Sequence, residues 1–237
     1  MEPTQQDLDF IDMLSRPEPL DDELTEHIYT DDTLGWEMLK HPLVFSIPYS
    51  PAMNPLLNRQ FRHKTEALDR ALESRDWHTW VWLHERPYRV DAFCEVLHLM
   101  TDAEYWPLLA HMWVDSENIR ENYRLWETLI TNDRPGREHF MDDEGTEALD
   151  ALPDIIDIYQ GHTLDRDDGW SWTTDEAKAV WFARRFGNLE NSTPIVTVAT
   201  VAKADVLGYL LSRGESEIIT DPDSVTITRT YAPGEPE

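Results

Sequence analysis

The spacing of apolar residues changes near Pro153, and this change is the strongest constraint on the fold. From Asn58 onward, Phe61, Thr65, Leu68 and Leu72 follow one another at steps of four, three and four, a spacing that predicts a helix. After Pro153, β-branched or alternating runs at 154–159, 194–201, 216–220 and 224–231 predict short strands. We therefore expect an α+β protein, with a helical N-terminal half packed on a small mixed α/β module.

The chain divides into three stretches of different composition. Residues 1–35 are acidic and contain Pro17 and Pro19, which predicts a loosely held arm with one or two short helices. Residues 36–150 are predicted to be helical, except that HPLVFSIPYSPAMNPLLN is rich in turn residues and predicts an ordered loop. Residues 151–237 form the module with the strands. Its one clear helix lies in TTDEAKAVWFARRFG, where Thr173 can cap the start and Gly187 can end it.

Composition restricts the partners. Twenty Lys and Arg against 47 Asp and Glu give a formal net charge of −27. A charge of this sign repels nucleic acid and favours a basic protein as partner. The excess of acidic residues is equally compatible with high solubility or with a surface that imitates DNA. With no apolar run of about 18 residues and no signal-peptide pattern, we expect a cytoplasmic protein that binds no membrane.

The cysteine and tryptophan residues point to a core rather than to a cofactor site. Cys94 is the only cysteine, which excludes a disulfide framework and a thiolate metal cluster, and we predict no metal site. Tryptophans at helical spacing form a core more often than a ligand cage. The predicted core tryptophans are Trp77, Trp80, Trp82, Trp106, Trp113 and Trp126. No spacing within residues 36–150 indicates a particular chemistry.

Three short segments after Pro153 stand at the ends of predicted elements. These are YQGH at 159–162, GWSWTT at 169–174 and RGESE at 213–217. Each alone is a weak signal, and the last could be an ordinary acidic turn, because acids make up about a fifth of the chain. Their order along the chain is the stronger signal.

In this order the segments resemble the arginine, serine and glutamate motifs of the ADP-ribosyltransferase superfamily. The sequence looks closest to ADP-ribosyltransferase-like proteins of bacteriophages and actinobacteria, and the resemblance covers residues ~40 to 222. It implies a split mixed β-sheet of ADP-ribosyltransferase type, with NAD as co-substrate between its halves. It also implies a phage-encoded enzyme in the host cytoplasm.

The resemblance assigns the two glutamates distinct roles. Glu217 matches the glutamate that bonds the nicotinamide ribose, where a fixed carboxylate stabilises an oxocarbenium-like transition state. Glu215 matches the position that orients an acceptor guanidinium in arginine-modifying members. Glu215 lies two residues earlier in the strand or its entry turn, so we expect the strand period of two to place both carboxylates on one side.

The remaining cofactor-binding residues also follow from the resemblance. Ser171 matches the serine that supports the glutamate strand, with Thr173 two residues on. Trp172 packs either on a ring of NAD or in the core. Gly161 belongs to the first motif. Gln160 stands where the family has an arginine that contacts the phosphates and ribose of NAD, so this charge-assisted contact is lost. His162 or Arg166 are the candidate substitutes, and His162 shares the face of Gln160 only if the strand continues through Gly161.

Two functions follow from this reading. The first is a mono-ADP-ribosyltransferase that transfers ADP-ribose from NAD to a protein side chain, arginine being favoured, on a basic host protein. The second is a catalytically degenerate protein of the same fold. In that case its acidic surface binds a basic host protein, in the manner of a DNA-mimicking decoy.

Overall fold

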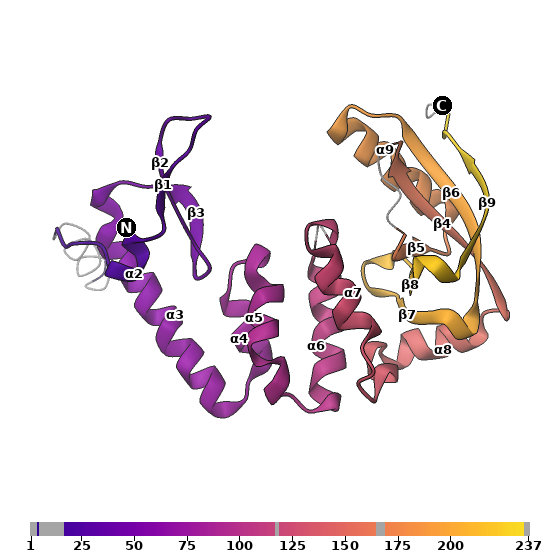
Figure 1. Cartoon of the computed structure of the whole chain (residues 1–237), viewed down its shortest axis with the longest axis horizontal. Helices are drawn as coiled ribbons and strands as arrows, with labels where there is room; N and C mark the ends of the chain where they lie inside the picture. The colour runs from indigo at the N-terminus through magenta and orange to yellow at the C-terminus, as the bar shows by residue number, and fades with distance from the viewer. Residues whose placement is uncertain (1–3, 5–16, 117–118, 165–168, 235–237) are drawn as a thin grey trace. The chain divides into compact units, whose positions relative to one another are not determined.

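The computed structural model describes residue 4 and residues 17–116, 119–164 and 169–234 (Figure 1). The chain divides into two compact units, Met1–Met100 and Thr101–Glu237. Both contain helices and a β-sheet, so the protein is α+β. No helix in these ranges is both long and apolar enough to cross a membrane. Most of the predicted N-terminal arm, residues 1–3 and 5–16, lies outside the described residues.

The N-terminal unit contains a three-stranded sheet that the sequence analysis missed. Strands β1 (Ile28–Thr30), β2 (Glu37–His41) and β3 (Val44–Pro48) pair in the order β1-β2-β3, antiparallel throughout. The prediction of an ordered loop here is therefore wrong. These strands have three to five residues, and prolines flank or end β3, so turn signals masked the alternation.

Helices cover one face of this sheet. The unit's helices are α2 (Asp22–Thr25), α3 (Asn54–Ser74), α4 (Trp77–Leu83) and α5 (Arg89–Val96). Leu39 of β2 packs in a buried cluster with Leu24 of α2 and with Leu57 and Phe61 of α3. Cys94 on α5 is half-buried, and burial raises the pKa of its thiol to about 11, so the thiol is neutral and poorly nucleophilic at pH 7.

The C-terminal unit begins with three helices, α6 (Asp102–Asp115), α7 (Tyr123–Thr131) and α8 (Asp143–Ala151). Thr101 and Glu104 form a capping box at the start of α6. Trp106, Trp113 and Trp126 are each 2% exposed or less, which confirms for them the prediction of a tryptophan-rich core.

A six-stranded sheet follows, in the order β7-β8-β5-β4-β6-β9. Its strands are β4 (Ile155–Thr163), β5 (Ser171–Thr173), β6 (Pro194–Ala202), β7 (Val206–Leu210), β8 (Glu217–Thr220) and β9 (Val225–Tyr231). Every pairing among them is antiparallel, so the predicted mixed sheet is wrong. Helix α9 (Glu176–Glu190) connects β5 to β6, and these two strands run in the same direction on either side of β4, since each is antiparallel to it.

The sheet is nearly divided between β4 and β5. Among the described residues these two strands share a single register pair, Tyr159 with Thr173, whereas β4 and β6 pair along nine residues. One half therefore consists of β7, β8 and β5, and the other of β4, β6 and β9.

Both ends of α9 differ from the prediction. Asp175 is the N-cap and accepts hydrogen bonds from the backbone N–H groups of Ala177 and Lys178, while Thr173 lies in β5. At the other end the helix continues past Gly187 and stops at Asn191, which has a left-handed φ of 51°. Asparagine tolerates this conformation better than most residues, so it can replace the expected glycine.

Helix α9 approaches β4 closely at Gly161. A Cβ added there would lie 1.9 Å from the backbone oxygen of Ala179 and 2.6 Å from the backbone nitrogen of Ala183. Neither backbone atom can move without shifting the helix. Gly161 therefore has a packing role, whatever else it does.

We predict that Gly161→Ala lowers the free energy of unfolding by about 1–3 kcal/mol or more, because the methyl group overpacks the contact between α9 and β4. Urea denaturation of the full chain measures this. Gly234→Ala is the matched control, because a Cβ at that position meets nothing within 4 Å. Equal stability of the two variants would contradict the packing role.

Candidate functional site

The three predicted motif segments lie on adjacent strands. Gln160 is on β4, Ser171 begins β5 and Glu217 begins β8, and these strands are neighbours in the order β8-β5-β4. Residues far apart in sequence thus meet at the place where the sheet is nearly divided. Thr173 pairs with Glu217, so these two side chains and that of Ser171 share one face of the sheet.

Glu217 is held by two donors from different elements. Its Oε1 accepts a hydrogen bond from the hydroxyl of Ser171, and a second from the indole Nε1 of Trp113 at 3.0 Å. Both donors are neutral groups, and together they orient the carboxylate. The side chain is half-buried, which strengthens such bonds relative to water.

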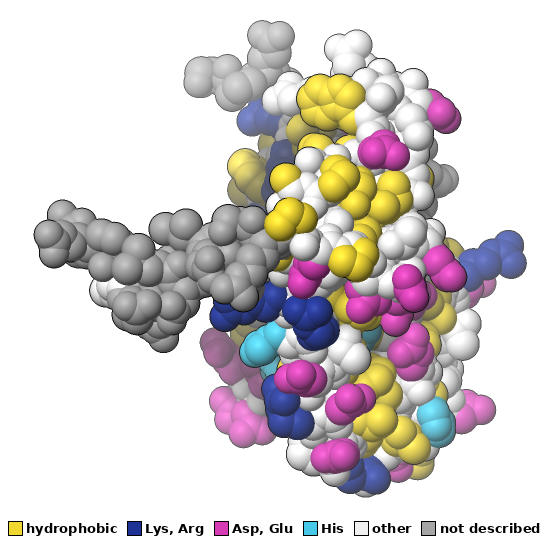
Figure 2. Space-filling model, turned by 90° about the vertical axis from the view of Figure 1, so that its left-hand side faces the viewer, with side chains coloured by type: hydrophobic (Ala, Val, Ile, Leu, Met, Phe, Trp, Pro, Cys, Tyr) yellow, Lys and Arg dark blue, Asp and Glu magenta, His cyan; other side chains and the backbone are white. Residues whose placement is uncertain are grey.

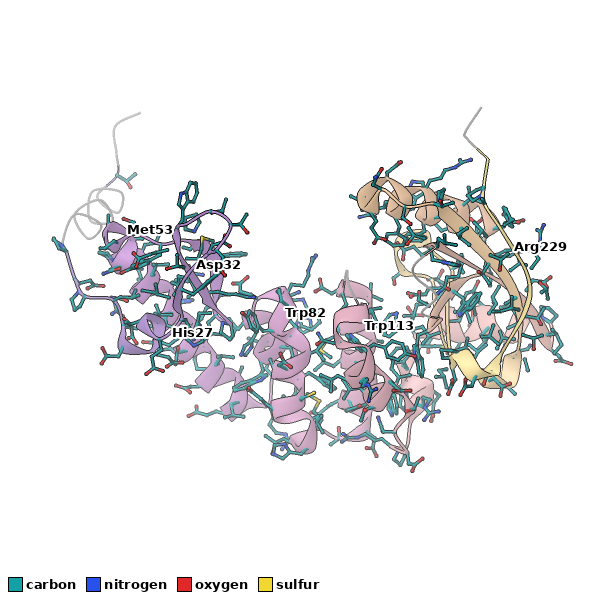
Figure 3. All side chains as sticks on the ribbon, turned by 45° about the horizontal axis from the view of Figure 1, so that its top comes forward. His27, Asp32, Met53, Trp82, Trp113 and Arg229 are labelled. Carbon is teal, nitrogen blue, oxygen red and sulfur yellow. The ribbon has the colours of Figure 1, made fainter. Side chains whose placement is uncertain are left out.

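Trp113 is the site residue that the sequence analysis missed. We predicted a core residue, and its side chain is 1% exposed and packs edge to face on Trp126, with ring centroids 5.3 Å apart. Its indole N–H nevertheless reaches Glu217, 104 positions away in sequence. Figure 3 labels Trp113 on helix α6. Helical spacing carries no signal for a contact this distant, so sequence reasoning had no means of finding it.

Gln160 bonds the backbone of Ser171 and not the carboxylate, because it follows Tyr159 on β4 and so faces away from Thr173 and Glu217. Its side-chain amide donates to the backbone oxygen of Ser171 at 3.1 Å. One hydrogen bond thus joins Gln160 to the backbone of Ser171, a second joins the Ser171 hydroxyl to Glu217, and a third joins Trp113 to Glu217. All three motifs belong to this series, which we call the Glu217 network.

Glu215 does not follow the strand alternation that we expected. Strand β8 begins only at Glu217, while Glu215 has helical dihedral angles and Ser216 has a φ of 48°. The expected alignment of the Glu215 and Glu217 carboxylates by a strand period of two is therefore wrong. The backbone of Glu215 is nonetheless fixed, because its carbonyl accepts a hydrogen bond from the hydroxyl of Thr173 at 2.7 Å.

His162 lies on β4 but bonds elsewhere. The strand does continue through Gly161, so His162 and Gln160 share a face as expected. The Nε2 atom of His162 lies 2.8 Å from the hydroxyl of Thr197 on β6, and its Nδ1 donates to the carbonyl of Thr163. The structure thus ties His162 to β6 and not to Glu217. Arg166, the other candidate substitute, lies outside the described residues.

Trp172 and Tyr159 flank the network. Trp172 is 5% exposed and belongs to the core cluster with Ile158 and Ile218, so of its two predicted roles the structure shows packing. Burial, followed by the nearby Glu176 and Asp157, raises the pKa of the Tyr159 phenol. This phenol is therefore neutral near pH 7.

No metal site is visible in the described part of the chain. Across residues 17–116, 119–164 and 169–234, no three His, Cys, Asp or Glu side chains are grouped so that they could hold a metal ion. The chemistry available to the Glu217 network is that of a carboxylate oriented by Ser171 and Trp113. Such a group can stabilise positive charge that develops on a bound molecule.

We predict that Trp113→Phe lowers the free energy of unfolding by about 1.5–3 kcal/mol, because it removes a buried hydrogen bond to a charged group. Trp126→Phe is the matched control, since it makes the same change in the ring that packs on Trp113. Urea denaturation measures both variants, and an equal loss of stability would assign the effect to ring packing alone.

The bond itself is observable by nuclear magnetic resonance of the indole N–H groups. We expect Glu217→Gln to shift the Trp113 indole resonance, because an amide oxygen is a weaker acceptor than a carboxylate. Glu215→Gln is the control and should leave that resonance in place. A Trp113 resonance that ignores Glu217→Gln would contradict the geometry.

Relatives supply no further information about this site. Comparison of the chain with protein-family models, with curated proteins and with solved structures gives no match. Any functional conclusion therefore depends on the geometry of the Glu217 network and on the order of the motifs.

Proposed function

We propose that the C-terminal unit is a mono-ADP-ribosyltransferase that transfers ADP-ribose from NAD to a protein side chain. Glu217 is the catalytic carboxylate, and the six-stranded sheet is a divergent split sheet of ADP-ribosyltransferase type. One observation carries the proposal. The Ser171 hydroxyl of the second motif donates to the Glu217 carboxylate that the resemblance designates, and Gln160 of the first motif donates to the backbone oxygen of the same Ser171.

The chemistry requires a fixed negative charge. In the transfer, the bond between the nicotinamide nitrogen and the ribose carbon breaks and its electron pair leaves with nicotinamide. The acceptor nitrogen then bonds to that carbon and loses a proton. Positive charge develops on the ribose meanwhile, and a carboxylate that is already oriented stabilises it without reorganising. Trp113 and Ser171 supply this orientation for Glu217.

The sheet offers a reason for the location of the network. Among the residues that the structure describes, a single register pair joins β4 to β5, and Gln160 and Ser171 lie on these two strands. The superfamily resemblance implies that NAD lies between two such halves. Gln160, Ser171 and Thr173 are therefore the residues that we assign to NAD, whereas the buried Trp113 positions Glu217.

The acceptor is assigned by Glu215 and by charge. Glu215 lies two residues before Glu217, with its backbone held by Thr173, and its carboxylate suits a guanidinium. The net charge of −27 favours encounter with a basic protein. We propose an arginine side chain of a basic host protein as the acceptor.

We predict that Glu217→Gln reduces transfer by roughly 100-fold or more, because an amide cannot stabilise the developing charge. The measurement is incorporation of label from NAD into proteins of a bacterial lysate and into agmatine, a small guanidine. Glu147→Gln is the control, since it neutralises an exposed acid of α8 outside the network. Label that is unchanged in Glu217→Gln would refute the assignment, provided that both variants keep the wild-type circular dichroism.

A second function is favoured by one observation, the uncharged side chain at Gln160. Its amide already donates to the Ser171 carbonyl, and it brings no positive charge for the phosphates of NAD. In this alternative the protein has the same fold but binds no NAD, and it acts through its acidic surface on a basic host protein.

Gln160→Arg distinguishes the two functions. If the unit is a transferase whose residue 160 contacts the NAD phosphates weakly, we expect Gln160→Arg to bind NAD about tenfold more tightly. A charged donor contributes more to the binding free energy than a neutral donor does. Isothermal titration calorimetry measures the affinity, and Gln160→Lys tests whether charge alone suffices. Absence of NAD binding in both the wild type and Gln160→Arg would favour the binding protein.

A further inference from the structure

We propose that His41 makes the hairpin of β2 and β3 a pH-sensitive switch, which is closed while the His41 imidazole is neutral and opens when that imidazole is protonated. The proposal concerns the N-terminal unit and does not rest on transferase chemistry. The ring of His27, labelled in Figure 3, lies against that of His41, and the buried His84 is close enough to act on it by charge.

The imidazole of His41 supports the turn of the hairpin. His41 ends β2 and pairs with Val44 at the start of β3, and Pro42 and Leu43 form the turn between them. The Nδ1 atom of His41 accepts a hydrogen bond from the backbone N–H of Leu43 at 3.1 Å. The carbonyl of Pro42 accepts another from the backbone N–H of Glu85 at 2.7 Å, so the same turn holds the segment that follows α4.

The hydrogen bond from Leu43 fixes the protonation state of His41. A ring nitrogen that accepts a hydrogen bond carries no proton, so the proton of the neutral ring is on Nε2. Protonation of Nδ1 would place two N–H groups against each other and would deprive the Leu43 N–H of this acceptor. A buried donor that loses its acceptor destabilises the structure around it. The closed hairpin therefore requires the neutral ring.

The side chains around His41 are mostly uncharged or cationic. The residue is 4% exposed and packs edge to face on Phe61 of α3, with ring centroids 5.2 Å apart. The ring of His27, just before β1, also lies edge to face on it at 4.5 Å, and the Nδ1 of His27 donates to the carbonyl of Lys40. The acid that faces His41 is Glu23 of α2, whose carboxylate oxygen lies 3.5 Å from Nε2.

These surroundings lower the pKa of His41 from its ordinary value of 6.5. Burial is the largest cause, followed by repulsion from a protonated His27, and His84 adds to the lowering. Glu23 raises the pKa, but its side chain is 63% exposed, so water screens its charge. Burial also lowers the pKa of His84, so this second ring beside the turn is neutral near pH 7 as well.

Acid therefore favours the open hairpin. In the open state the ring is solvated and its pKa returns to about 6.5, whereas in the closed state the pKa is lower. The open state thus binds more protons below pH 6.5, and opening becomes more favourable as the pH falls. For one histidine the opening constant can rise by up to about 30-fold between about pH 7.5 and pH 5.0. Opening would expose Leu39 and Val44, which the closed hairpin buries.

Hydrogen exchange of the Leu43 amide in the full chain measures the opening constant, after correction for the intrinsic effect of pH on exchange. We expect this constant to be larger by about fivefold or more at about pH 5.0 than at about pH 7.5. His41→Asn tests the cause, because the asparagine Oδ1 atom can accept the hydrogen bond from Leu43 but binds no proton in this range. This variant should lose most of the increase.

His63→Asn is the matched control. Figure 2, which looks onto the N-terminal unit, shows in cyan histidine rings at its surface. His63 on α3 is exposed, so its ring is solvated whether the hairpin is closed or open. His63→Asn should therefore keep the increase of the wild type. The same pH dependence in His41→Asn as in the wild type would overturn the proposal, and so would an opening constant that does not change with pH.

A measurement on the wild type covers the case in which His41→Asn does not fold. Nitrogen magnetic resonance of the imidazole rings reports which ring nitrogen carries the proton. We expect the neutral ring of His41 to carry it on Nε2, and to titrate at a lower pH in the folded chain than in the chain unfolded by urea. A proton on Nδ1 of the neutral ring, or the same titration in both states, would contradict the switch.

Discussion

The close contact between α9 and β4 at Gly161 is the constraint on which the C-terminal unit depends. Strand β4 joins the two halves of the sheet, since it pairs along nine residues with β6 and at one position with β5. The helix can lie on this strand only because no side chain stands between Gly161 and the backbone of Ala179. Gly161, which we predicted to bind the cofactor, thus has a role in packing α9 against β4.

Once β4 and β5 are placed, the Glu217 network follows from strand order. Ser171 and Glu217 begin neighbouring strands, and Gln160 reaches the backbone of Ser171 from β4. Trp113 adds a donor from a helix that precedes the sheet in sequence.

The N-terminal unit illustrates why short strands escape sequence analysis. Strand β2 buries Leu39 and His41 and directs Met38 and Lys40 outward, which is ordinary alternation over only five residues. The prolines near β3 suggested a loop, although Pro48 occupies an edge strand where it costs little. The two-sided character of this sheet was hidden for the same reason, since the exposure of Trp36 and Phe45 has meaning only once the opposite face is known to be covered.

The sequence alone determined the α+β class, the main helices, strands β4, β6, β8 and β9 and the order of three motifs, whereas β5 and β7 were missed. Each of these is encoded in local spacing, which a chain displays without folding. Only the tertiary structure decided that every strand pairing is antiparallel, that Asp175 rather than Thr173 caps α9, and that Trp113 bonds Glu217. Contacts between distant residues depend on how elements pack, and spacing along the chain carries no record of that packing.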